Sequence, residues 1–172
     1  TDRRWLLWHW SRTHPCGCRG AKPGTQMSAP DPLLPWLGKE LTTQALISVD
    51  TANLMQVTLN REPNLCEGDE LPPAWHWLYF HEPTMADDLG VEGHPKLGGF
   101  MPPVSFVGNE DHPPRRMWAG GTLTFNSPIR LGDRATKRSR IRSITPKEGR
   151  SGRLVFVEVG HEVRVDDEVR LT

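Results

Sequence analysis

The sequence has little cysteine, a single tyrosine and no excess of charge of either sign. Its 172 residues contain three cysteines, and 21 basic side chains balance 21 acidic ones. An odd number of cysteines cannot form a closed disulfide framework, which favours a reducing compartment such as the cytoplasm. A protein that binds nucleic acid electrostatically would carry a basic excess, so the charge balance argues against that partner. No apolar run approaches the roughly 20 residues of a membrane-spanning helix, so a membrane span is not expected.

Residues 1–26 differ in composition from the rest of the chain. They carry three of the seven tryptophans, two of the three cysteines and a basic excess. We expect this leader to be a disordered tail, upstream sequence that precedes a start at Met27, or an arginine-rich transit peptide that would make the protein mitochondrial. Its prolines and glycines would break a targeting helix, which favours the first two interpretations. Residues 27–172 are then expected to form one folded domain.

A helix is predicted just after residue 48. Ser48 or Asp50 can cap its start, and it ends near Asn60 because Pro63 cannot extend it. The aromatic segment 74–80 predicts a short buried strand. Residues 81–117 are rich in proline and glycine, which predicts a long irregular segment.

Strand patterns dominate the last third of the chain. Leu123 and Phe125 alternate with polar residues up to Pro128, and residues 133–145 alternate between a strongly basic face and a mixed one. A glycine-containing turn at 147–152 leads to a long strand, one face of which carries valines and His161. We interpret His161 as a core or interface residue that is able to titrate near neutrality. The predicted order is one helix followed by about four antiparallel strands, an α+β domain with a curved sheet packed on that helix.

A single short helix cannot cover a sheet with such long strands. Apolar surface is therefore left over, and an exposed apolar patch of this kind indicates a partner. A dimer, or a second copy of the same fold, is the expected solution.

Five segments of the chain resemble, in order, the N-terminal dehydratase domain of the MaoC-type hydratases. They are LPPAWHWLYF (71–80), GGFMPP (98–103), RRMWAGG (115–121), FNSPIRLGD (125–133) and KEGRSGRLVFV (147–157). Among these enzymes, the mesaconyl- or itaconyl-CoA hydratases and the hydroxyacyl-thioester dehydratases are the most similar. The resemblance implies a hotdog fold, in which a curved antiparallel sheet wraps around one helix and pairs with a second hotdog. It also implies a hydratase or dehydratase of enoyl or 3-hydroxyacyl thioesters of CoA or acyl carrier protein, with no cofactor beyond the thioester itself.

The acid/base pair of such enzymes resides in a motif of the form Gly-Asp-x-Asn-Pro-x-His. Here Gly68 and Asp69 are followed by His76 at a separation of seven residues from the aspartate, where the motif has five, and the asparagine is missing. Asp69 and His76 are therefore weak catalytic candidates. Their alternative roles are a solvated turn residue for Asp69 and a core histidine hydrogen-bonded to backbone for His76. The resemblance implies that the working pair lies in a second hotdog, and that this chain corresponds to the substrate-side lobe.

The segment 115–121 is the candidate for substrate binding. Arg116 can meet a phosphate or pantetheine oxygen, Trp118 can line an acyl-pantetheine channel, and Gly120 and Gly121 allow backbone to approach a ligand closely. The alternative is a bend in which glycine only relieves strain. Arginines 134, 138, 140 and 142 can hold the 3′-phosphate of CoA, although a solvated sheet face explains them as well.

No metal site is expected. A structural zinc site needs four ligands in paired spacing, and the pair Cys16 and Cys18 beside His14 has no second pair downstream, since Cys66 stands alone.

The predicted function is one component of an acyl-thioester hydratase or dehydratase, as a homodimer or a heterodimer with a catalytic hotdog subunit. The alternatives are a non-catalytic module that binds acyl-CoA and a hotdog thioesterase.

Overall fold

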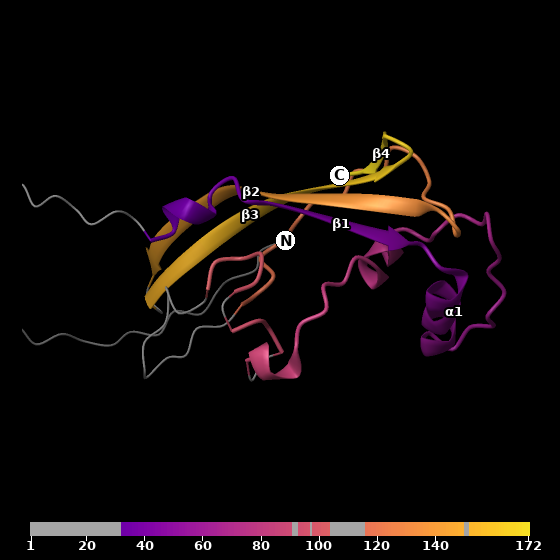
Figure 1. Ribbon diagram of the computed structural model, residues 1–172, viewed down its shortest axis with the longest axis horizontal. Helices are drawn as coiled ribbons and strands as arrows, with labels where there is room; N and C mark the ends of the chain where they lie inside the picture. The colour runs from indigo at the N-terminus through magenta and orange to yellow at the C-terminus, as the bar shows by residue number, and fades with distance from the viewer. Residues whose placement is uncertain (1–31, 91–92, 97, 104–115, 150–151) are drawn as a thin grey trace, which may run out of the picture. The chain divides into compact units, whose positions relative to one another are not determined.

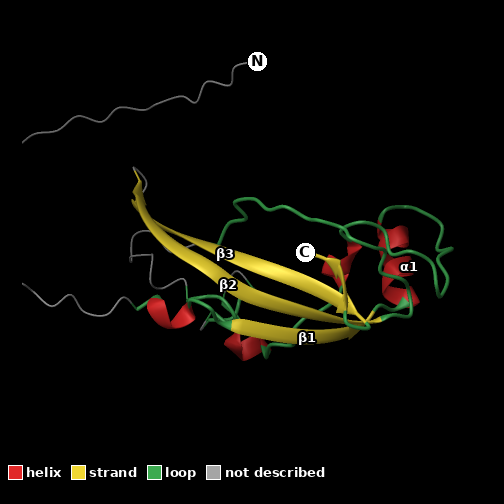
Figure 2. Cartoon of the chain, turned by 90° about the horizontal axis from the view of Figure 1, so that it is seen from above, coloured by secondary structure: helices red, strands yellow, loops and turns green. Residues whose placement is uncertain are grey.

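The computed structural model describes residues 32–90, 93–96, 98–103, 116–149 and 152–172. Its elements are η1 (Leu34–Trp36), β1 (Glu40–Leu46), α1 (Val49–Thr58), η2 (Trp75–Leu78), η3 (Ala86–Asp88), β2 (Arg134–Gly149), β3 (Gly152–Val165) and β4 (Glu168–Leu171). The strands form one antiparallel sheet in the order β1-β2-β3-β4, and the sheet is visibly curved (Figures 1 and 2). In the described part of the chain no helix has the length and apolarity to cross a membrane.

The predicted fold class is confirmed. The chain forms an α+β domain in which a curved antiparallel sheet accompanies one α-helix, as expected of a single hotdog domain. Pairing with a second hotdog stays a prediction. The leader, residues 1–26, lies outside the described residues, so its interpretation and the domain boundary at residue 27 also stay predictions.

Helix α1 follows β1 through a capped turn. The Ser48 side chain accepts a hydrogen bond from the Thr51 amide at 3.4 Å, and Asp50 in the first turn suits the positive end of the helix dipole. The helix ends at Thr58, which confirms the predicted helix and its cap. Ala52 is fully buried against the core, whereas Leu54 is exposed, so the helix is only partly covered.

The sheet has an inner and an outer face, and the inner face holds the core. Strand alternation places Ala135, Ser139 and Ile141 of β2 on the same face as Val163 and Val165 of β3. The segments that pack under this face contribute Ile47, Leu71, Tyr79, Phe80, Ile129 and Leu131. The predicted valine face of β3 is thereby confirmed at the end of the strand that lies nearest α1.

Three details of the predicted topology are wrong. The sheet begins with β1, ahead of the helix, so the order is one strand, one helix and three strands. The segment 74–80 forms the 3₁₀ helix η2 and no strand, because Ala74 takes a left-handed conformation with φ of 68° directly after two prolines. Leu123 and Phe125 lie in a segment that forms no full strand: it pairs with the chain end through the Phe125–Leu171 bridge and the backbone hydrogen bonds of Thr124 with Thr172.

The β2–β3 hairpin extends well beyond the core. Its register shifts at a bulge between Ile141 and Ser143, and past this point Leu154 and Phe156 are exposed while Val155 and Val157 are half-buried. Apolar surface is therefore left uncovered within the described part of the chain, as expected for a sheet with long strands and one short helix. The described parts of 81–117 are irregular apart from η3, and the remainder of that segment lies outside the described residues.

Candidate functional site

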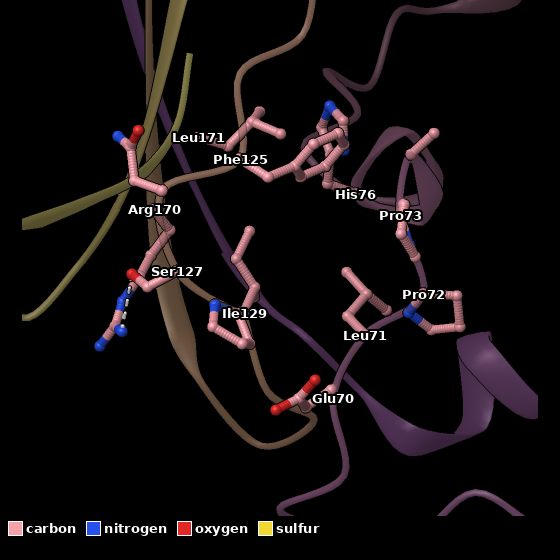
Figure 3. A pocket seen from close by; sticks show the side chains of 13 residues that line it. Glu70, Leu71, Pro72, Pro73, His76, Phe125, Ser127, Ile129, Arg170 and Leu171 are labelled. Carbon is pink, nitrogen blue, oxygen red and sulfur yellow. Dashed lines mark hydrogen bonds between the residues drawn. The ribbon is translucent and has the colours of Figure 1, made fainter.

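A pocket of about 270 Å³ lies where segments 70–76 and 125–129 meet the end of β4 (Figure 3). Leu71, Phe125 and Ile129 give it apolar walls, and Glu70 and Arg170 stand at its polar side. A mixed lining of this kind suits a small organic ligand that carries one or two polar groups.

His76 is placed in this pocket by the turn that precedes η2. The left-handed Ala74 directs His76 inward, where it is only 5% exposed, and leaves Trp77 outside. The imidazole makes no hydrogen bond with any residue that the structure describes. Burial lowers the pKa of His76, and the neighbouring Lys137 and His161 lower it further, which favours the neutral imidazole.

Asp69 is an exposed turn residue that takes no part in the pocket. Its carboxylate accepts a hydrogen bond from the Cys66 amide at 2.8 Å. Within the described residues no contact joins this carboxylate to His76, and the acid that lines the pocket is Glu70, which pairs with Arg130 at 3.1 Å. The fold therefore does not assemble the two sequence candidates into an acid/base pair.

A second polar group, which sequence reasoning missed, lies on the inner face of the sheet. We call Thr43, Lys137, Ser139 and His161 the inner-face cluster. Thr43 and Lys137 are direct cross-strand partners, as are Ser139 and His161. The Ser139 Oγ lies 2.9 Å from the His161 Nδ1, and Ser139 is only 2% exposed.

The cluster is electropositive, and one of its polar groups has no hydrogen-bond partner among the described residues. Burial lowers the pKa of Lys137, although the negative charge of Glu82 opposes the shift. Burial also lowers the pKa of His161, and the charges of Lys137 and Arg142 lower it further. The hydroxyl of Thr43 is buried without a hydrogen-bond partner among the described residues.

One signal in the sequence pointed to this cluster. Alternation places Lys137 and Ser139 on the same face as the apolar Ala135 and Ile141, where a lysine is unexpected. Finding Thr43 and His161 beside them required the register of β1 and β3, which a single sequence does not supply.

The substrate-binding candidates fall into two groups. Arg116 donates from its Nη2 to the carbonyls of Gly98 at 3.2 Å and Pro102 at 3.1 Å, and burial lowers the pKa of its guanidinium. Gly98 has φ of 89°, and a Cβ there would overlap the Met101 carbonyl oxygen, so only glycine fits. This guanidinium thus holds a tightly folded loop together.

Trp118 and the two glycines form the more open group. Trp118 is 77% exposed, and its ring centroid lies 6.2 Å from that of Trp77. A Cβ on Gly121 would lie 2.8 Å from the Trp118 ring, whereas nothing lies within 4 Å of the corresponding position on Gly120. Gly121 therefore lets the ring of Trp118 lie against the backbone.

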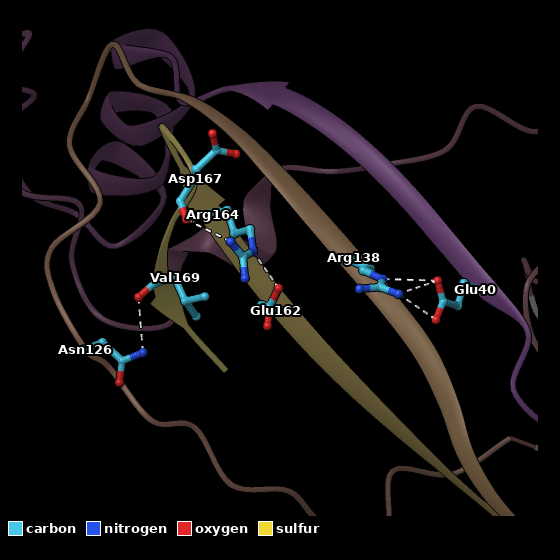
Figure 4. A network of polar contacts seen from close by, with 7 residues as sticks. All are labelled: Glu40, Asn126, Arg138, Glu162, Arg164, Asp167 and Val169. Carbon is cyan, nitrogen blue, oxygen red and sulfur yellow. Dashed lines mark hydrogen bonds and ion pairs between the residues drawn. The ribbon is translucent and has the colours of Figure 1, made fainter.

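Two of the four arginines that were candidates for a phosphate, Arg138 and Arg140, are engaged by an acid. Arg138 makes a bidentate contact with Glu40 at 2.8 to 3.0 Å (Figure 4). Arg140 lies 3.6 Å from the same carboxylate. These pairs are exposed, which favours the solvated-face interpretation.

The described residues contain no group of three or more histidine, cysteine or acidic side chains arranged to hold a metal ion. The motif with His14, Cys16 and Cys18 lies outside them.

Two comparisons with known proteins bear on the site. The profile of a family described as hydroxyacyl-thioester dehydratase type 2 matches residues 74–172, which include His76, the pocket wall at 125–129 and most of the inner-face cluster. A mesaconyl-C(4)-CoA hydratase of Chloroflexus aurantiacus is 38% identical over 129 residues, which is 74% of this chain. The matched region is 44% of that relative, so the chain spans less than half of its length.

Proposed function

Because the chain belongs to the hydroxyacyl-thioester dehydratase type 2 family, we propose that it is the substrate-side lobe of an acyl-thioester hydratase or dehydratase. The reaction adds water across the C2–C3 double bond of an enoyl thioester, with hydroxyl to C3 and a proton to C2, or runs in reverse. It transfers a proton and a hydroxide, so no redox cofactor is needed. The observation that carries this proposal is the family match over residues 74–172, which contain β2, β3, β4 and the pocket residues from Ala74 onward.

A second lobe is proposed to supply the acid/base pair. Asp69 is held in a turn, and His76 has no carboxylate contact in the described chain, so neither is prepared for proton transfer as part of a pair. The exposed Leu154 and Phe156 at the far end of the β2–β3 hairpin offer apolar surface that such a lobe can cover. We propose a homodimer or a heterodimer with a catalytic hotdog, located in the cytoplasm.

The acyl-pantetheine channel is proposed to run past Trp118, Gly120 and Gly121, with Arg116 as the positioning residue that fixes the loop at 98–102. An exposed indole offers a flat apolar surface to a pantetheine chain. Trp118→Ala should weaken binding of crotonyl-CoA about 5-fold or more in calorimetry. Met117→Ala is the matched control, since Met117 is an exposed neighbour, and it should leave binding unchanged. Equal affinities for the two variants would contradict this channel.

A hydratase assay tests the activity. Crotonyl-CoA and mesaconyl-CoA are supplied to the chain alone, and to the chain mixed with a hotdog domain that carries an intact Asp/Asn…His motif. We expect turnover only in the mixture. Robust turnover by the chain alone that His76→Ala abolishes would show that the catalysis lies in this lobe.

The competing function is a module that binds acyl-CoA without reacting. It is favoured by the separation of Asp69 from His76, and binding without turnover in every mixture would establish it. Release of free CoA thiol in the same assays would instead indicate a thioesterase.

A further inference from the structure

We propose that the pocket formed by segments 70–76 and 125–129 and the end of β4 holds the acyl chain of the thioester, and that it selects chains that are short, aliphatic and uncharged. This inference rests on the proposed function and narrows the acyl groups that the lobe accepts. A mesaconyl group carries a free carboxylate, so the inference predicts an acyl preference unlike the one that the name of the Chloroflexus aurantiacus relative indicates.

The first argument is the apolar lining of the pocket. Its walls are made mostly of the side chains of Leu71, Phe125, Ile129, Leu171 and three prolines. Phe125 is 50% exposed, so much of its ring is not covered by the protein itself. An aliphatic chain that lies against these walls removes their surface and its own from water.

The second argument is that the two charged side chains of the lining already have partners. Glu70 lies 3.1 Å from Arg130, and Arg170 lies 3.3 Å from Glu168. Arg170 also donates to the Ser127 hydroxyl at 3.2 Å, and its Nε is enclosed by the protein. A carboxylate on the acyl chain would lose water against the apolar walls and would meet no unpaired cation there, which is costly.

His76 adds a polar group that is neutral and open to the pocket. Its ring nitrogens have no hydrogen-bond partner among the described residues, and they are not among the polar side-chain atoms that the protein encloses there. They therefore reach open space, and Figure 3 shows His76 beside Phe125 on the side of the pocket opposite Glu70. A neutral imidazole offers one donor and one acceptor, which suits a hydroxyl or carbonyl group on an uncharged chain.

The pocket adjoins the proposed pantetheine channel through η2. The ring centroid of Trp77 lies 6.2 Å from that of Trp118, which belongs to the channel, and 5.7 Å from that of His76, which lines the pocket. Consecutive residues of η2 thus contact the channel and the pocket. A pantetheine arm that passes Trp118 brings its acyl end toward the pocket.

The size of the pocket limits the length of the chain. An apolar cavity of about 150 Å³ holds one benzene molecule, so a volume of about 270 Å³ has room for a chain of roughly six to ten heavy atoms. Short acyl groups therefore fill the pocket.

Calorimetry on the full chain tests the chain-length and charge preferences, with free CoA, acetyl-CoA, butyryl-CoA, hexanoyl-CoA and succinyl-CoA as probes. We expect the affinity to rise from acetyl-CoA to hexanoyl-CoA by about 4-fold per methylene, as burial of an aliphatic chain predicts. Butyryl-CoA and succinyl-CoA have acyl groups of the same length, and only the second carries a carboxylate. Succinyl-CoA should bind about 10-fold more weakly than butyryl-CoA.

A pair of variants on one segment assigns the preference to the pocket. Phe125→Ala removes an apolar wall and should weaken the binding of hexanoyl-CoA about 5-fold while leaving that of acetyl-CoA unchanged. Leu123→Ala is the matched control, because Leu123 is also exposed, lies two residues earlier and does not line the pocket. It should leave both affinities unchanged.

Nuclear magnetic resonance of the histidine rings locates the bound chain in the unmodified protein, which covers the case in which Phe125→Ala does not fold. Hexanoyl-CoA should shift the ring signals of His76, which the variant His76→Phe identifies. The signals of His94, at an exposed loop position, should not move, and free CoA should shift neither set.

The inference is overturned if the affinity does not rise from acetyl-CoA to hexanoyl-CoA, or if succinyl-CoA binds as tightly as butyryl-CoA. Unchanged His76 signals in the presence of bound hexanoyl-CoA would also overturn it, since the chain would then lie elsewhere. These three results leave the proposed function intact, because a thioester is still bound. If no thioester binds, the proposed function fails together with the inference.

Discussion

The two faces of β2 carry cations in opposite settings. On the outer face, Arg138 and Arg140 share the Glu40 carboxylate in contact with water. On the inner face, Lys137 is half-buried with no acid at ion-pair distance among the described residues, next to a buried hydroxyl that also lacks a partner. The outer charges keep the face solvated and add little stability, whereas burial on the inner face disfavours the charged form of Lys137 and lowers its pKa.

The largest expected effect concerns the packing of the inner face. Ile141 is fully buried there, so Ile141→Ala should lower the free energy of unfolding by about 2–5 kcal/mol, as truncation of a core side chain does. Urea unfolding followed by circular dichroism measures the change. Thr145→Ala, at an exposed position of the same strand, is the control and should cost less than about 1 kcal/mol. Similar losses for both variants would show that the inner face is not a packed core.

The next effect is the pH dependence of the inner face. The pKa of His76 and of His161 is lowered from the ordinary 6.5, chiefly by burial. The unfolded chain therefore binds more protons than the folded chain as the pH falls through this range, and the free energy of unfolding decreases with it. We expect a lower urea midpoint at pH 5.5 than at pH 7.5.

Two histidine variants separate this effect from general acid sensitivity. His76→Gln should reduce the difference between the two midpoints, because one of the two responsible imidazoles is gone. His94→Gln, at an exposed loop position, should leave the difference unchanged. An identical response of both variants would mean that burial of His76 does not cause the pH dependence.

Local sequence patterns predicted correctly the elements whose bounds depend on nearby residues alone. Ser48 and Pro63 bracket α1, and the alternation of valines assigns β3 and its buried face. The same rules missed β1, whose sequence ELTTQAL has few apolar residues because one side of this edge strand faces water. They also misjudged segment 74–80, where the left-handed Ala74 overrides the strand preference of the aromatic residues.

The surroundings of the candidate site residues depend on how distant strands pair, so they were predicted less well from the sequence than the helix and β3 were. His76 was named from the sequence, but its neighbours Lys137 and His161 come from strands more than fifty residues away. Arg116 was chosen for its charge, and in the structure its guanidinium donates hydrogen bonds to two loop carbonyls. The alternation of apolar and polar residues indicates which face of a strand a side chain occupies. The pairing of the strands determines which side chains it contacts on that face.

A smaller effect is expected from two serines that occupy opposite faces of β2. Ser139 bonds His161 on the buried inner face, and Ser143 donates to Glu158 at 3.1 Å on the exposed outer face. Ser139→Ala should cost about 1 kcal/mol of unfolding free energy, because a buried hydrogen bond is lost. Ser143→Ala should change it by less than about 0.5 kcal/mol. Thermal unfolding of the two variants side by side measures both, and a larger loss for Ser143→Ala would reverse the assignment of the faces.

The smallest effect is expected on the outer face itself. Arg138→Gln removes a bidentate pair with Glu40, yet the unfolding free energy should fall by less than about 1 kcal/mol, since both side chains are exposed and Arg140 remains near the same carboxylate. The loss should shrink further in 1 M salt, where the screening length is about 3 Å. Urea titrations at low and high salt measure this. A loss above about 1 kcal/mol that persists in high salt would mean that the outer face is covered by a partner, because only a desolvated ion pair resists screening.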